Sequence, residues 1–172
     1  AMRFRVLVIE VGQLFEFATS GIRLFFTKPY RFDELIIHME FIGNKSLGII
    51  LLSGLFTGMA LAYQIFLGFR LVNAVSLVGP TVGLGITREL GPVLTGLIVS
   101  ARAGGAMIAR IGTMRVTEQI DALEVMGVNP IQYLVSPRII AAVVVMPLLT
   151  GVFDFIAMVG CWVICIKLLD MD

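Results

Sequence analysis

The chain has 172 residues, of which 58% are hydrophobic and 15% are charged, and its formal net charge is +1. Soluble domains average about 25% charged residues, so this composition and a mean hydropathy of +0.98 indicate an integral membrane protein. The small net charge argues against a nucleic-acid partner, which would require a basic face.

Residues 1–45 are predicted to form interfacial helices. Between residues 4 and 26, apolar side chains recur at helical spacing on one side, and charged or polar side chains occupy the other. Such a helix lies along the membrane interface rather than crossing it. Pro29 ends this helix, and residues 32–45 are predicted to be a second interfacial segment. His38, the only histidine, is placed near the headgroups with no catalytic role.

Residues 46–69 carry no charge and are long enough to cross a bilayer, which takes about 20 residues. This first predicted span contains Gly54 and Gly58, whose GxxxG spacing permits close approach of another helix. The motif is common in apolar helices, so it is weak evidence by itself.

The second predicted span, residues 75–106, contains a charged pair, Arg88 and Glu89. Pro92 follows the pair, removes a backbone hydrogen bond and favours a bend in the helix. Small residues repeat every fourth position further along the span and predict a close-packing face: Gly96, Ser100 and Gly104.

Residues 117–127 are predicted to form a short amphipathic helix between the second and third spans. Thr117 is a favoured N-cap residue, and Gly127 and Pro130 mark the end. One face would be acidic, with Glu118, Asp121 and Glu124, and the other would be apolar, with Ile120, Leu123 and Met126. On spacing alone, an acidic face that is merely solvated remains the alternative to a docking face.

The third predicted span, residues 139–166, contains Pro147 and Asp154. Residue counts from the two ends of the 102–138 loop place Arg88 and Asp154 at similar heights, so we expect these two residues to pair. Glu89 would then face the cavity and meet the lipid headgroup or a bound water, because charges in a membrane normally face protein or a wet cavity. The alternative is that both charges only stabilise helix packing. Cys161 and Cys165 share one face, and simple packing is favoured over a bridge or a metal site.

Positive residues gather before the first span and around the 102–138 loop. The positive-inside rule therefore places the N-terminus and this loop in the cytoplasm. We expect no catalytic residue, metal site or cofactor.

The run from Gly112 to Arg138, GTMRVTEQIDALEVMGVNPIQYLVSPR, with RELGPVLTGL before it, resembles the MlaE/YrbE permease family. The resemblance covers roughly residues 30–172. It implies the transmembrane subunit of an ABC transporter that moves phospholipids or other lipids between membranes. The expected location is the bacterial inner membrane, with several spans.

The resemblance also implies partners. Two copies of the permease would pair, and each would bind a cytoplasmic, MlaF-like ATPase through the helix residues Glu118, Asp121, Leu123, Glu124 and Met126. An MlaD-like MCE-domain protein would contact the outer face, and an MlaB-like STAS-domain protein would attach to the ATPase. The phospholipid would lie near Leu61, Phe69, Val72, Arg88 and Glu89.

Two features depart from the family pattern. Members usually carry an acidic residue in the motif AELGTM, where this chain has Arg110. The family also normally has about five spans, whereas three are predicted here. We therefore expect this sequence to be the N-terminal part of a longer protein.

Two rival functions are less well supported by the residues. A membrane-embedded lipid-modifying enzyme would need convergent catalytic groups, and His38 with Asp154 does not supply a nucleophile and base. A secondary transporter would show internal repeats with broken helices at matching positions, and no convincing repeat is present. No Walker-type phosphate-binding motif occurs, so ATP hydrolysis is expected on a separate subunit.

Overall fold

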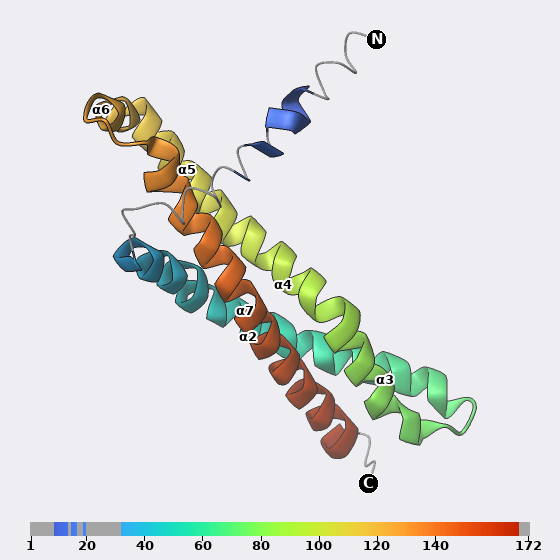
Figure 1. Ribbon diagram of the computed structural model, residues 1–172. Coiled ribbons are helices and arrows are strands. Elements are labelled where there is room, and N and C mark those ends of the chain that lie inside the picture. Colours follow the sequence, from blue (N-terminus) through green and yellow to red (C-terminus); the bar gives the residue numbers. More distant parts are fainter. Residues whose placement is uncertain (1–8, 14, 17–18, 20–31, 169–172) are drawn as a thin grey trace. The chain divides into compact units, whose positions relative to one another are not determined.

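The computed structural model describes residues 9–13, 15, 16, 19 and 32–168, and all regular elements in them are helices (Figure 1). Three helical stretches are long and apolar enough to cross a membrane: Phe32–Arg70, Val75–Val116 and Ile131–Lys167. Only 17–22% of the most apolar window of each stretch is buried within the chain, so lipid or further helices must cover the remainder. The predicted all-α membrane fold with three spans is confirmed.

The predicted N-terminal interfacial helix, residues 4–26, lies mostly outside the described residues. The positions described within it are helical, and their large apolar side chains are exposed: Ile9, Val11 and Phe15. Its place along the membrane interface remains a prediction.

The first span belongs to α2, which runs over Phe32–Arg70 and begins earlier than predicted. Its 39 residues rise about 58 Å, whereas the hydrocarbon core of a bilayer is about 30 Å thick. Residues 32–45 are not a separate helix, because no proline interrupts them and they continue directly into the span. Their place at the membrane interface remains a prediction. A tight turn follows α2, in which Asn73 has a φ of 54°. Asparagine tolerates this left-handed conformation better than most residues do.

The second span is a helical run with π-helical turns inserted in it. Its parts are η1 (Val75–Leu77), α3 (Val78–Gly85), η2 (Ile86–Leu90), α4 (Gly91–Val99), η3 (Ser100–Gly104) and α5 (Gly105–Val116). A π-helical turn, η2, lies directly before the turn that contains Pro92. The bend expected at Pro92 remains a prediction. The helix continues to Val116 rather than ending near residue 106, because no proline stops it there.

A short helix, α6 (Gln119–Val125), separates the second span from the third. The third span comprises η4 (Ile131–Val135), α7 (Ser136–Val163) and η5 (Ile164–Leu168). It begins at residue 131 rather than the predicted 139, and α7 remains helical through Pro147.

The chain divides into two compact units, residues 1–40 with 106–144 and residues 41–105 with 145–172. In the second unit, α2 and α7 pack with their backbones close together. A methyl group at Gly58 would overlap the backbone of Ala157, and one at Gly160 would overlap the backbone of Leu55. The close approach predicted from the GxxxG spacing is thereby confirmed.

The other predicted close-packing face, at Gly96, Ser100 and Gly104, is not used within the described chain. No described neighbour would lie within 4 Å of a methyl group at Gly96 or Gly104. The spacing identified small residues but could not identify which of them meet another helix.

Candidate functional site

The helix α6 is exposed and lies between two spans, but its first residue was predicted incorrectly. Thr117 is not an N-cap: its hydroxyl donates to the carbonyl oxygens of Thr113 and Met114, at 2.9 and 3.4 Å, within the turn that ends α5. Threonine commonly bonds back to the preceding turn in this way. Glu118 instead makes the break between the helices, with a left-handed φ of 56°.

The end of α6 agrees with its sequence signals. The last helical residue is Val125, and Gly127 has a φ of 73°, which glycine adopts without strain. The next helical segment begins directly after Pro130.

The exposed surface of α6 contains apolar as well as acidic side chains. Ile120 and Leu123 are half-buried, as expected for the inward face. Met126, however, is 67% exposed and Val125 is 89% exposed. We call five of the exposed residues the coupling surface, after the ATPase-coupling role expected of this helix: Glu118, Asp121, Glu124, Val125 and Met126.

Val125 was missed at the sequence level, although a helical wheel contains the signal. At about 100° per residue, Val125 falls between Glu118 and Asp121 on the acidic side. An exposed valine among acids is poorly suited to water and well suited to a protein partner with mixed apolar and basic groups.

Asp121 has a partner within the chain. Arg115, near the end of α5, donates to its carboxylate at 2.8 Å, and the two side chains are 65% and 55% exposed. An exposed pair of this kind contributes at most about 1 kcal/mol of stability, so it orients α6 more than it stabilises the fold. Glu118 and Glu124 have no described ion-pair partner.

The charged pair of the second span lies in the π-helical turn η2. Both Arg88 and Glu89 are exposed. Turns of this type are frequent at functional sites because they redirect side chains within a helix. In a bilayer, these charges require a protein partner or a wet cavity beside them.

The expected pairing of Arg88 with Asp154 is wrong. Asp154 Oδ1 is buried and has no hydrogen-bond partner, and the residue it lies against is Gly91, where a methyl group would overlap that oxygen. Counting residues gave the height of each side chain but not its direction around the helix. The π-helical turn changes that direction, so Gly91 faces α7 while Arg88 is exposed.

A double-mutant cycle tests this correction. Arg88→Gln and Asp154→Asn should change the free energy of unfolding independently, with a coupling energy below about 0.5 kcal/mol. Thermal unfolding of the two single variants and the double variant in the same detergent measures it. A coupling energy above about 1 kcal/mol would show that Arg88 and Asp154 do form an ion pair.

The remaining predicted lipid-binding residues lie at the far end of α2. Leu61 and Phe69 are half-buried, and Val72, in the turn after α2, is 68% exposed. The structure does not gather them with Arg88 and Glu89 around one described cavity, so their role remains a prediction.

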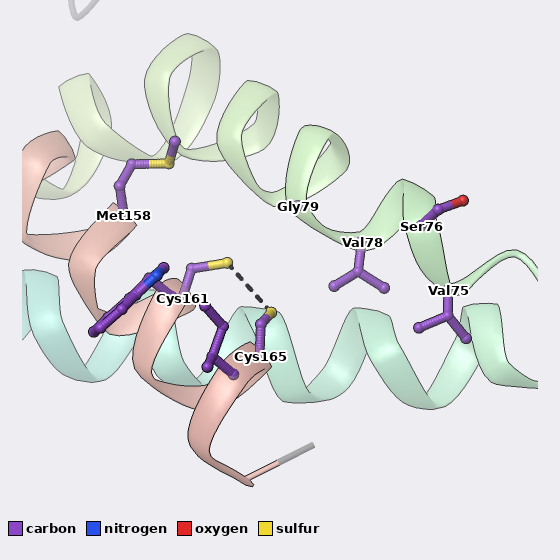
Figure 2. A pocket seen from close by; sticks show the side chains of 9 residues that line it. Val75, Ser76, Val78, Gly79, Met158, Cys161 and Cys165 are labelled. Atoms are coloured by element: carbon purple, nitrogen blue, oxygen red, sulfur yellow. Dashed lines mark hydrogen bonds between the residues drawn. The ribbon is translucent and has the colours of Figure 1, made fainter. Parts of the chain in front are cut away.

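A cavity of about 590 Å³ lies instead between the start of the second span and the end of the third. It is lined by Val75, Ser76, Val78, Gly79, Met158, Cys161, Trp162, Cys165 and Ile166. Figure 2 shows the valines and the cysteines on different helices around it. No charged side chain lines this cavity, so it can hold a hydrocarbon chain but not a headgroup.

The two cysteines in that wall are free thiols. Their sulfur atoms are 3.9 Å apart, which is a thiol contact and not a disulfide. The packing role favoured from the sequence agrees with this arrangement.

Three long apolar helices and a short polar helix between two of them define a multi-pass α-helical membrane protein. Residues 35–172 match the family described as Permease MlaE, and the chain belongs to this family.

Curated relatives match over most of this chain. A probable ABC transporter permease protein of Rickettsia bellii is 39% identical over 163 residues, which are 95% of this chain and 63% of the relative. The intermembrane phospholipid transport system permease protein MlaE of Haemophilus influenzae is 43% identical over 129 residues, 75% of this chain and 49% of the relative.

The protein TRIGALACTOSYLDIACYLGLYCEROL 1, chloroplastic, of Arabidopsis thaliana is 43% identical over 112 residues, 65% of this chain and 32% of the relative. The chain thus spans less than two thirds of the length of these relatives.

Proposed function

We propose that this chain belongs to the permease subunit of an ABC transporter that moves phospholipids between the inner and outer membranes of a bacterial cell. The observation that carries the proposal is the coupling surface on α6. Membership of the MlaE permease family and the phospholipid transport named for the Haemophilus relative support the same transport class.

The coupling surface docks a cytoplasmic, MlaF-like ATPase that hydrolyses ATP on the permease's behalf. Its acidic residues suit basic residues of the ATPase, while exposed Val125 and Met126 suit an apolar pocket. This arrangement requires α6 and the N-terminus to lie in the cytoplasm, in agreement with the distribution of positive residues.

The other partners follow from the family. A second copy of the permease completes the membrane unit, an MlaD-like MCE-domain protein receives or delivers lipid at the outer face, and an MlaB-like STAS-domain protein attaches to the ATPase. The low internal burial of the three spans supports extensive contact with further helices or lipid.

The phospholipid contacts Glu89 and Arg88 through polar groups, while its acyl chains contact apolar surface. Because both side chains are exposed at the π-helical turn η2, they are available to a headgroup or to the water that accompanies it. Leu61, Phe69 and Val72 supply apolar contacts on the first span.

Glu89→Gln tests this role of the charged pair. We expect phospholipid transport to fall at least about tenfold, because a lost charge-assisted hydrogen bond costs about 1.5–3 kcal/mol. The yield and melting temperature of the complex should stay unchanged, since Glu89 is exposed. The matched control is Glu40→Gln, which changes an exposed glutamate on a different helix, α2, and should transport normally. Wild-type transport by Glu89→Gln would exclude Glu89 from the lipid path.

A further inference from the structure

The first compact unit contains a buried group of ionisable side chains that the proposed transport function does not use. His38 and Arg138 are each only 7% exposed. They come from the first part of α2 and the first turn of α7. Buried arginine is rare unless it is paired, so this position requires an explanation.

One nitrogen of the Arg138 guanidinium lacks a partner. Its Nη1 is buried and has no hydrogen-bond partner. The charged groups close enough to act on it are Arg110 and Glu34, and the same two groups and Arg138 act on His38. Glu34 forms no described ion pair with Arg138, so its carboxylate does not satisfy the buried donor.

The charge of this group is unbalanced. With His38 neutral, Arg110 and Arg138 contribute two positive charges and Glu34 one negative charge, which leaves one positive charge in excess. Removing an unpaired ion from water costs several kcal/mol, and burying an unsatisfied donor adds to that cost. An anion held between the two arginines would remove both penalties.

Phosphate is an anion whose shape suits this group. A guanidinium presents its donors in a planar fork that bonds two oxygens of a phosphate group at once. The imidazole of His38 offers a further donor. Arg110 is exposed, so the group can be reached from the surface of the protein.

We propose that His38, Arg110 and Arg138 form a binding site for a phosphate group, supplied by an anionic phospholipid headgroup or by free phosphate. The site is distinct from the coupling surface and from Arg88 and Glu89. The proposal rests on residues of the first compact unit alone. It does not depend on which substrate the protein transports.

Melting temperature in a phosphate-free detergent measures binding. Three additives are compared at equal ionic strength: phosphatidylglycerol, diacylglycerol with the same acyl chains, and inorganic phosphate. Phosphatidylglycerol should raise the melting temperature and diacylglycerol should not. If inorganic phosphate acts equally, free phosphate is sufficient; if it has no effect, the site is specific for a lipid headgroup.

Two variants and a control make the test specific. Arg138→Gln should weaken phosphatidylglycerol binding by about tenfold to a hundredfold, as expected for a lost charged hydrogen bond. Arg110→Glu places a carboxylate near Arg138 that can take the role of the anion. The melting temperature of this variant should therefore not rise when phosphatidylglycerol is added. Arg115→Gln, on the same helix as Arg110 but paired with Asp121, should respond like the wild type.

The proposal is overturned if phosphatidylglycerol and diacylglycerol have the same effect on the wild type. It is also overturned if Arg110→Glu keeps the full response to phosphatidylglycerol. The new carboxylate should occupy the place of the phosphate, so a full response would mean that no phosphate binds there. None of these melting temperatures depends on lipid transport. The test of the phosphate site therefore remains valid even if the proposed transport function is wrong.

Discussion

Reversing the charges of Glu118 and Asp121 to lysine is expected to release the ATPase from the permease. Both side chains are exposed on the coupling surface, so lysine there would repel the basic groups that the acids attract. Interface charge pairs of this kind are worth about 1.5–7 kcal/mol, so affinity should fall at least about tenfold. Co-purification of the ATPase and its stimulated hydrolysis rate measure the loss.

The fold of the permease should survive this change. Asp121 loses its bond to Arg115, but the exposed pair contributes little stability. Glu40→Lys, at an exposed acid on α2, is the control and should retain the ATPase. Normal complex yield and normal ATP hydrolysis in the Glu118→Lys, Asp121→Lys variant would remove the coupling role from α6.

Gly58→Ala is expected to damage the packing of α2 against α7 severely. The added methyl group would overlap backbone atoms of Ala157, and backbone cannot rotate aside as a side chain can. Overpacking in a well-packed core costs about 1–3 kcal/mol, and a backbone clash lies at the upper end or beyond. The yield of folded protein and its melting temperature in detergent should both fall.

Gly48→Ala provides the matched control on the same helix. No described neighbour would lie within 4 Å of its methyl group, and alanine is the better helix former by about 1 kcal/mol. This variant should be as stable as the wild type or slightly more stable. Equal melting temperatures for Gly58→Ala and the wild type would show that the two helices do not pack as closely as the structure has them.

The sequence predicted the elements that depend on local chemistry. Apolar runs of sufficient length fix the three spans, and Gly127 fixes the end of α6 through its left-handed φ of 73°. Local signals failed where two interpretations competed. Thr117 has the side chain of an N-cap, but the same hydroxyl bonds back to Thr113, so the break falls one residue later, at Glu118.

Contacts between helices were harder to predict from the sequence. Gly58 and Gly96 both belong to small-residue repeats, yet of these two only Gly58 meets another helix among the described residues. The height of Asp154 was estimated from residue counts, but its direction depends on the π-helical turn before Gly91, which no sequence period reveals. The cavity beside Cys161 was missed because its walls come from segments far apart in the chain.

Reconstitution of the full-length permease with its ATPase tests the transport function most directly. Donor vesicles carrying the complex and a fluorescent phospholipid would be mixed with acceptor vesicles and the MCE-domain partner, with and without ATP. A lipid permease driven by a separate ATPase predicts phospholipid transfer that requires ATP and disappears in the Glu118→Lys, Asp121→Lys variant. Transfer at the same rate without ATP, or ATP hydrolysis that the permease does not alter, would contradict it.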